Sequence, residues 1–137
     1  MTRENLWLVK CTDRDGGDVD DLREEHMAGH LAHIEAIVDH IAMAGPLKDP
    51  AGEKIVGSML VYRTDDLEQA KAWLDGDPYA RCGIWGTIEW SRLVLAAGTL
   101  AGGMTWECLT VRRPRSVATL ESISRASERM KCIREQC

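Results

Sequence analysis

The architecture of the chain can be inferred first from the segment IVGSMLVYRTDDLEQAKAWLDGDP, residues 55–78. Its first part, Ile55 to Tyr62, is apolar and β-prone and predicts a strand. Gly57 would weaken that strand, so we expect a bulge or a close backbone approach there. Asp65-Asp66 then begins a helix with apolar residues along one side, and Gly76-Asp77-Pro78 ends it. The segment is thus a strand followed by a helix.

Before this segment, the sequence predicts a strand, a long helix and a short strand. Leu6-Trp7-Leu8-Val9 has the character of a buried strand. The helix extends roughly from Val19 to His40, with two acidic residues where a helix N-terminus favours them. Ile41-Ala42-Met43-Ala44 is a short strand that breaks at Gly45-Pro46. The predicted core face of the helix has apolar residues at spacings of three and four, namely Met27, Leu31, Ile34, Val38 and Ile41.

A fourth strand, from Ile84 to Leu95, follows the segment. The resulting order βαββαβ is that of the ferredoxin-like split motif, so the predicted fold class is α+β. Right-handed crossovers place the two helices on one face of a four-stranded antiparallel sheet. The opposite face must also be covered, and in a chain this short a second subunit would do so. We therefore expect a homodimer packed sheet to sheet.

The chain divides by composition into a domain over residues 1–97 and a C-terminal extension over residues 98–137. The domain holds 10 basic and 18 acidic side chains, whereas the extension holds 7 basic and 4 acidic ones. The extension begins with small residues, and residues 116–134 have a partial helical pattern. It is interpreted as a docked helical arm, an oligomer contact or a partly disordered segment.

The overall composition excludes several classes of protein. A net charge of −5 argues against a nucleic-acid partner, which would require a basic face. The five cysteines are scattered and form no C-x-x-C pair, so a zinc ribbon or a redox motif is not supported. We expect no signal peptide, and the sequence has no apolar run of transmembrane length. We expect a cytoplasmic protein with free thiols and no membrane partner.

All four histidines, His26, His30, His33 and His40, lie in the first predicted helix. They fall beside the apolar face, and His30 is the one nearest to it. Three ligands on one helix suit a metal ion poorly because the ring directions diverge, so no metal site is predicted. The other three are interpreted as solvated residues of the helix face. His30 alone is then either a structural imidazole at the core edge or a functional group.

Asp77 gives His30 a candidate partner. It follows the second helix, which lies beside the first in this topology, so its carboxylate can approach one end of the first helix. A carboxylate facing an imidazole fixes its tautomer and raises its basicity, which suits general acid–base chemistry. The alternative for Asp77 is ordinary turn chemistry before a proline.

At these residues the sequence resembles the YciI-like (YCII) family. The matching pieces lie in order between about Leu6 and Leu95. They are His30-Leu31, Ala44-Gly45-Pro46-Leu47, Gly57-Ser58 and, most clearly, DPYARCGIW at residues 77–85, which is similar to the family pattern D-P-[FY]-x-x-x-G-[ILV]-[FWY]. The resemblance implies a dimeric α/β-barrel built from ferredoxin-like subunits. It also implies that the histidine and aspartate proposed as the family's active-site residues correspond to His30 and Asp77.

Four further residues are candidates for substrate binding in the cleft between the first helix and the sheet. Pro46 would line this cleft, and Ser58 would donate a hydrogen bond to a substrate oxygen or be a simple strand serine. Tyr79 would offer its hydroxyl or merely pack. Arg23, two turns before His30, would meet an anionic substrate or be a solvated helix arginine.

The resulting hypothesis is a cofactor-free lyase or isomerase that acts on a small oxygenated, ring-containing acid or phenol. His30 would abstract or deliver a proton and Asp77 would orient it. Some YCII proteins are linked to dehydrochlorination of hydroxylated aromatic compounds, so this aromatic-catabolic reaction is one form of the hypothesis. The alternatives are a non-catalytic module that binds a small molecule and a dimerisation module whose working part is the basic extension.

Overall fold

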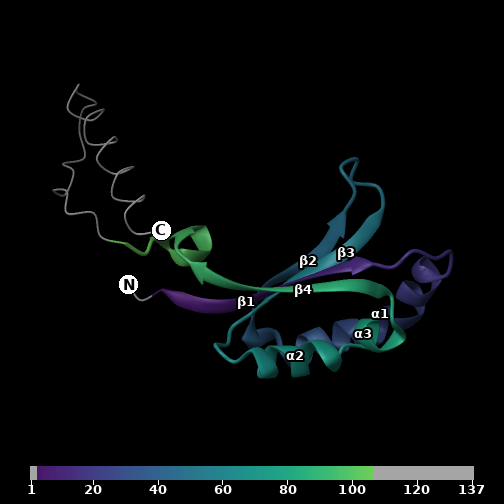
Figure 1. Ribbon diagram of the computed structural model, residues 1–137, viewed down its shortest axis with the longest axis horizontal. Helices are drawn as coiled ribbons and strands as arrows, with labels where there is room; N and C mark the ends of the chain where they lie inside the picture. Colours follow the sequence, from purple (N-terminus) through teal and green to yellow (C-terminus); the bar gives the residue numbers. More distant parts are fainter. Residues whose placement is uncertain (1–2, 107–137) are drawn as a thin grey trace. The chain divides into compact units, whose positions relative to one another are not determined.

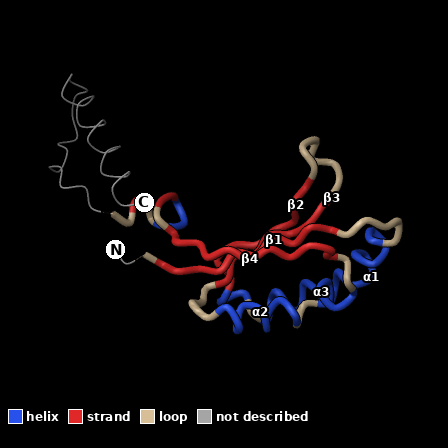
Figure 2. Tube along the Cα trace, viewed as in Figure 1, coloured by secondary structure: helices blue, strands red, loops and turns tan. Residues whose placement is uncertain are grey.

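The computed structural model describes residues 3–106, and the chain divides into two units that are treated separately below. The first unit, Thr2–Leu95, contains one four-stranded sheet with helices on one of its faces (Figures 1 and 2). Its strands are β1 (Glu4–Asp13), β2 (Ile41–Lys48), β3 (Ile55–Tyr62) and β4 (Trp85–Leu95). Its helices are α1 (Val19–Ala36), the 3-10 turn η1 (Val38–His40), α2 (Leu67–Asp75) and α3 (Pro78–Cys82).

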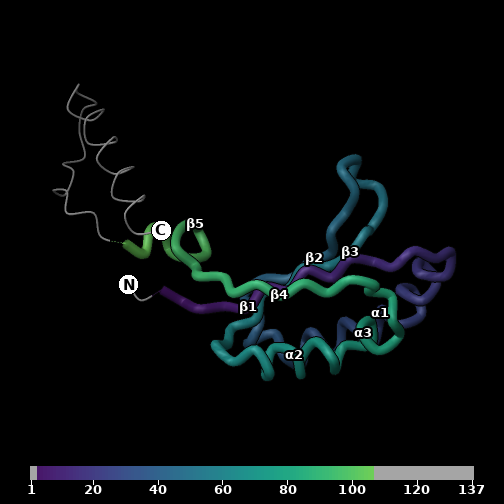
Figure 3. The backbone as a smooth tube through the Cα atoms, in the orientation of Figure 1, coloured from purple at the N-terminus to yellow at the C-terminus, as the bar shows by residue number. Residues whose placement is uncertain are grey.

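The strand order is β2-β3-β1-β4, and every neighbouring pair is antiparallel. Helix α1 connects β1 to β2, and α2 connects β3 to β4, so each helical connection passes over one intervening strand. This is the ferredoxin-like βαββαβ arrangement, and the prediction of an α+β fold is confirmed. The backbone tube shows that the β2–β3 hairpin projects away from the side on which the helices lie (Figure 3).

The core lies between the helices and the sheet. Strand alternation sends Val9 and Cys11 of β1 and Leu60 and Tyr62 of β3 toward the helices, and all four are fully or almost fully buried. At Gly57 the neighbouring strand β1 comes too close for a side chain, because a Cβ there would collide with the main-chain oxygen of Cys11. The close backbone approach expected at Gly57 is thus present.

Short-range hydrogen bonds explain where α2 and α3 begin. The Asp66 carboxylate accepts a hydrogen bond from the Glu68 main-chain nitrogen (3.0 Å) at the start of α2. Only two residues separate α2 from α3, and the Asp77 carboxylate begins α3 in the same way, with Pro78 at the first helical position. The predicted end of α2 is confirmed, but the start of α3 differs from the simple turn expected at Asp77-Pro78.

Three of the predicted boundaries or core assignments are wrong. Helix α1 ends at Ala36, and β2 continues through Gly45-Pro46 to Lys48. Proline is tolerated there because β2 is an edge strand and needs no N–H toward its open side. Three residues of the predicted core face are about half exposed: Met27, Leu31 and Val38. Met27 and Leu31 lie at the wall of a cavity, whereas Val38 belongs to η1.

The second unit, from Ala96 onward, is described only as far as Trp106. It contains a two-stranded ladder of β5 (Ala97–Gly98) and β6 (Gly103–Met104), joined by the 3-10 turn η2 (Thr99–Ala101). The helix predicted over residues 116–134 lies outside the described residues. None of the helices within residues 3–106 has the length and apolar character needed to cross a bilayer.

Candidate active site

His30 and Asp77 form a hydrogen-bonded pair between α1 and the start of α3. The His30 Nδ1 atom lies 2.9 Å from Asp77 Oδ1 and 2.8 Å from Oδ2. The Asp77 side chain is 1% exposed and the His30 side chain 17% exposed. Because a carboxylate only accepts, Nδ1 carries the proton of this bond in the neutral imidazole. The Nε2 atom then keeps its lone pair, which is the arrangement required of a general base.

The position of Asp77 follows from its role as the cap of α3. Its Oδ1 atom accepts a hydrogen bond of 2.9 Å from the Tyr79 main-chain nitrogen, in addition to the bond with His30. A residue that begins a helix in this way has little freedom at either its main chain or its side chain. The carboxylate is therefore held in place from one side before it meets the imidazole on the other.

Tyr79 covers one face of the His30 imidazole. The two rings are stacked, with centroids 4.1 Å apart and planes inclined by 15°. The Tyr79 hydroxyl donates a hydrogen bond of 3.2 Å to the main-chain oxygen of Arg23, and the residue is 5% exposed. Burial raises the pKa of this hydroxyl. The hydroxyl that was a candidate for substrate binding is thus already hydrogen-bonded within the protein.

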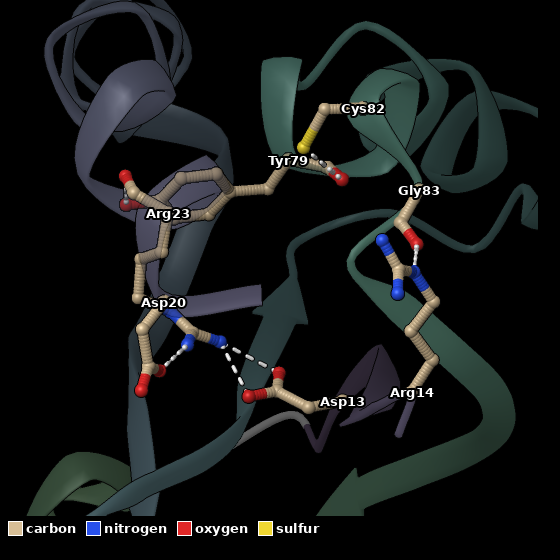
Figure 4. Close-up of polar contacts among 7 residues, drawn as sticks. All are labelled: Asp13, Arg14, Asp20, Arg23, Tyr79, Cys82 and Gly83. Carbon is tan, nitrogen blue, oxygen red and sulfur yellow. Dashed lines mark hydrogen bonds and ion pairs between the residues drawn. The ribbon is translucent and has the colours of Figure 1, made fainter. Parts of the chain in front are cut away.

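Arg23 is ion-paired and mostly buried, so the alternative of a solvated helix arginine is wrong. Its Nη2 atom lies 2.6 and 2.7 Å from the two carboxylate oxygens of Asp13, and both side chains are 12% exposed. Asp20 lies on the other side of the guanidinium, at 3.5 Å from Nη1 (Figure 4). The Nη1 atom is buried without a hydrogen bond to any described residue. Sequence reasoning missed Asp13 as this partner because the two residues lie on different elements.

A cavity of about 340 Å³ lies between α1 and the strands β2 and β3. It brings together five of the six predicted site residues, since Arg23, His30, Pro46, Ser58 and Tyr79 all line it. Asp77 is not in the lining and supports His30 from behind. The rest of the wall is apolar or glycine and comprises Met27, Leu31, Ile34, Ala44, Gly45, Ile55, Met59 and Leu60. The size and apolar lining are typical of a site for a small molecule.

Two of the other histidines, one in the last turn of α1 and one in η1, contact Trp73 of α2. His33 Nε2 lies 2.8 Å from the main-chain oxygen of Trp73, and the His40 ring stacks on the Trp73 ring at a centroid distance of 4.8 Å. His33 is therefore not simply solvated, whereas His40 is exposed as predicted and also stacks on an aromatic ring. Residues 3–106 contain no group of three His, Cys, Asp or Glu side chains that could hold a metal ion.

Cys11 lies in the core near Asp77, and its thiol is unreactive at neutral pH. Burial, followed by the nearby carboxylates of Asp77 and Asp13, raises the pKa of its thiol to about 12. The same causes, burial first and Asp77 second, raise the pKa of the Tyr62 hydroxyl. Neither group ionises near neutral pH, so the reactive chemistry available at this site belongs to His30.

Several known proteins are similar to this chain. The model of the family described as "YCII-related domain" matches residues 6–92, more than half of the chain. The chain is 32% identical over 93 residues to the Xenovulene A biosynthesis cluster protein asL2 of Sarocladium schorii, covering 60% of this chain and 79% of asL2. It is 33% identical over 63 residues to Protein YciI of Escherichia coli O6:H1, covering 41% of this chain and 64% of YciI, just under two thirds of that relative.

Among solved structures, the chain is similar to TftG, the 5-chloro-2-hydroxyhydroquinone dehydrochlorinase of Burkholderia phenoliruptrix AC1100. The TM-score is 0.57 at 22% sequence identity, over 69% of this chain and 96% of TftG. At this identity the likeness concerns the fold, which is the one described above. The family match rests on sequence and includes both His30 and Asp77. The chain therefore belongs to the YCII family.

Proposed function

We propose that this protein is a cofactor-free lyase or isomerase in which His30 acts as general acid and base and Asp77 orients it. The observation that carries the proposal is the hydrogen bond between His30 Nδ1 and the buried Asp77 carboxylate, at the wall of a cavity that can hold one small ring. A histidine anchored through one nitrogen presents the other to a ligand. General acid–base catalysis of this kind contributes typically about 10²- to 10⁴-fold.

The lining of the cavity supports a small oxygenated, ring-containing substrate. Apolar side chains form most of the wall, and they suit a planar ring better than a highly charged ligand. Ser58, on the helix-facing side of β3, lies in the lining and would donate a hydrogen bond to a ring oxygen. Pro46, directly opposite Ser58 on β2, would limit how far the ring can move toward the edge of the sheet. The guanidinium of Arg23 would contact a second oxygen.

Dehydrochlorination of a hydroxylated ring is the form of this chemistry that a similar structure suggests. TftG is named as a dehydrochlorinase and its structure is a complex with 2,5-dihydroxybenzoquinone. In such a reaction the base takes a proton, the electron pair left behind forms a new π bond, and chloride leaves with the electrons of the C–Cl bond. The balance is the loss of H⁺ and Cl⁻, and it needs no oxidant. His30 would accept the proton at Nε2.

The proposal is tested with the full chain and 5-chloro-2-hydroxyhydroquinone, by following chloride release. Incorporation of solvent deuterium into the same compound detects proton transfer that stops short of elimination. His30→Gln should lower the rate by about 10²- to 10⁴-fold while the protein stays folded. His40→Gln is the matched control, because His40 also stacks on an aromatic ring but lies outside the cavity. Unchanged turnover in His30→Gln would refute the role of His30.

The same experiment separates the enzyme from a non-catalytic binding module. A ligand that raises the melting temperature but is neither dechlorinated nor deuterated would favour the module. A third alternative, a dimerisation module, would be favoured if removal of residues 98–137 abolished partner binding with the cavity intact.

We further propose that the protein is a cytoplasmic homodimer formed through the sheet face that the helices do not cover. Strand alternation places Leu8 and Leu93 on that face, and both are only partly buried. Apolar residues at the centre of an open face favour burial against a second copy. Sedimentation equilibrium measures the mass, and substitution of Leu8 by a charged residue should yield a monomer. A wild-type chain that sediments as a monomer would contradict the dimer.

A further inference from the structure

We infer that Tyr79 is a positioning residue for His30: its ring fixes the plane of the imidazole and favours the imidazole's protonated form. This inference rests on the proposed function only in taking His30 as the group that exchanges a proton with the substrate. The sequence suggested Tyr79 as a substrate contact, but its hydroxyl is bound to the Arg23 main chain and its ring lies over His30. The available contact of Tyr79 is therefore with the imidazole.

Tyr79 and Asp77 together restrain the imidazole ring of His30. The hydrogen bond from Nδ1 to Asp77 anchors one atom of the imidazole, and a ring held at one atom can still swing about that bond. A second ring stacked at 4.1 Å and inclined by only 15° blocks this motion on one face. The direction of the Nε2 lone pair is then set by two side chains, Asp77 and Tyr79, that are only two residues apart.

Tyr79 is itself held in place by three contacts. Its main-chain nitrogen donates to Asp77 Oδ1 (2.9 Å), its hydroxyl donates to the Arg23 main-chain oxygen (3.2 Å), and its ring edge meets Trp85. The side chain is thus fixed at both ends and along one edge. The same short helix, α3, therefore supplies both the carboxylate and the aromatic ring that contact His30.

The contact between Tyr79 and His30 is also electrostatic. When Nε2 takes up a proton, the imidazole becomes a cation that lies over the face of an aromatic ring, and the ring quadrupole attracts it. Even at exposed sites such a contact favours the cation by about two- to fivefold, and the effect grows as the contact is desolvated. The carboxylate of Asp77 acts in the same direction from the edge of the imidazole. Tyr79 would thus make His30 a stronger proton acceptor through its contact with the imidazole.

Other charged and titratable groups surround His30 and must be considered in any titration. From the neighbouring elements these are Asp77, Tyr79 and, beside Asp77, Cys11 and Tyr62. On its own helix they are Arg23, His26 and His33. Burial raises the pKa of Cys11 to about 12 and raises that of Tyr62, so both stay neutral between pH 5 and 8.5. Arg23 forms an ion pair with Asp13.

The test is an NMR titration of the His30 ring in the full chain without substrate, with the signal assigned from His30→Gln. In Tyr79→Leu, which keeps bulk but removes the ring, the pH at which His30 takes up its proton should fall by about half a unit, a threefold loss of proton affinity. Tyr79→Phe keeps the ring and should titrate like the wild type. Trp73→Leu removes the ring stacked on His40 and should change His40 but leave His30 unchanged.

An unchanged His30 titration in Tyr79→Leu would overturn the inference. A shift in Tyr79→Phe as large as that in Tyr79→Leu would also overturn it, because the hydroxyl would then carry the effect. If Tyr79→Leu does not fold, pentafluorophenylalanine at position 79 keeps the shape of the ring and reverses its quadrupole. It should lower the proton affinity of His30 below that of Tyr79→Phe, and equal values would contradict the inference.

Turnover is read separately, so the two proposals fail independently. A titration shift in a protein that turns over no substrate would leave Tyr79 in its positioning role and remove only the proposed reaction. If the reaction is present, Tyr79→Leu should lower kcat several-fold with KM almost unchanged, because the residue acts through His30. An increase in KM alone would indicate substrate contact and refute the positioning role.

Discussion

Replacing Asp77 by asparagine separates the two hydrogen bonds that its carboxylate accepts. The amide oxygen of asparagine can still accept the Tyr79 main-chain N–H, so the cap of α3 is kept. The amide nitrogen, however, is a donor and would face His30 Nδ1. The imidazole must then accept at Nδ1 and carry its proton on Nε2, which is the wrong tautomer for a base. We expect Asp77→Asn to fold and to lose about 10²- to 10⁴-fold of any His30-dependent activity.

The stability change follows from the same contacts. A hydrogen bond to a charged group contributes about 1.5–3 kcal/mol, and the replacement bond returns about 1 kcal/mol, so Asp77→Asn should cost about 0.5–2 kcal/mol. Asp77→Ala loses the cap as well and should cost about 2.5–4 kcal/mol. Asp66→Ala is the matched control, because Asp66 caps α2 but has no histidine partner, and it should cost only about 1 kcal/mol.

Urea denaturation measures these differences, and ¹⁵N NMR of the imidazole identifies the tautomer. The reasoning is refuted if Asp77→Asn retains the proton on Nδ1, or if it matches Asp77→Ala in stability. The first result would mean that Asp77 does not set the tautomer. The second would mean that asparagine does not preserve the cap.

Three further predictions concern groups around the site. Above pH 9 the Cys11 thiol ionises in the unfolded chain, but in the folded chain it stays protonated until about pH 12. The free energy of unfolding should therefore fall by up to about 1.4 kcal/mol per pH unit between these values. In urea titrations at alkaline pH, Cys11→Ala should show a smaller fall. Gly57→Ala should lower the stability measured by thermal unfolding by about 1–3 kcal/mol, because its Cβ meets the main chain of β1. Gly45→Ala should change the stability by less than about 0.5 kcal/mol, because no atom lies within 4 Å of its Cβ. Arg23→Met leaves the mostly buried carboxylate of Asp13 unpaired and should lower the stability measured in urea by about 3–5 kcal/mol. Asp20→Asn removes an exposed partner of Arg23 and should change the stability by less than about 1 kcal/mol. Equal losses of stability in the two glycine variants, or in Arg23→Met and Asp20→Asn, would contradict the contact on which that prediction rests.

Most of the fold follows from local sequence, because strand and helix periods and the two aspartate caps are short-range signals. Ile55 to Tyr62 is a strand with the predicted bounds, and its glycine has the close contact that a glycine in a strand implies. The second strand was misjudged because Gly45-Pro46 ends most isolated strands. Only the sheet order, which makes β2 an edge strand, shows that proline is acceptable there.

The candidate site was predictable where a motif joined distant parts of the chain. His30 and Asp77 lie 47 positions apart, and periodicity alone cannot bring them together. The family resemblance paired them. The stacking of Tyr79 on His30 and the ion pair of Arg23 with Asp13 depend on side-chain directions that no spacing rule gives. The sequence Asp-Pro, however, is a typical start of a helix, and it could have revealed α3.

The Asp77 oxygen that binds both His30 and Tyr79 also links the site to local opening of the fold. The Tyr79 amide hydrogen is bound to the same carboxylate atom that meets His30, so its exchange with deuterated water reports opening of α3 away from α1. An amide that exchanges only on global unfolding would mean that the pair stays assembled throughout the native ensemble. Faster exchange, slowed by a bound ring compound, would identify α3 as the element through which ligands enter and leave.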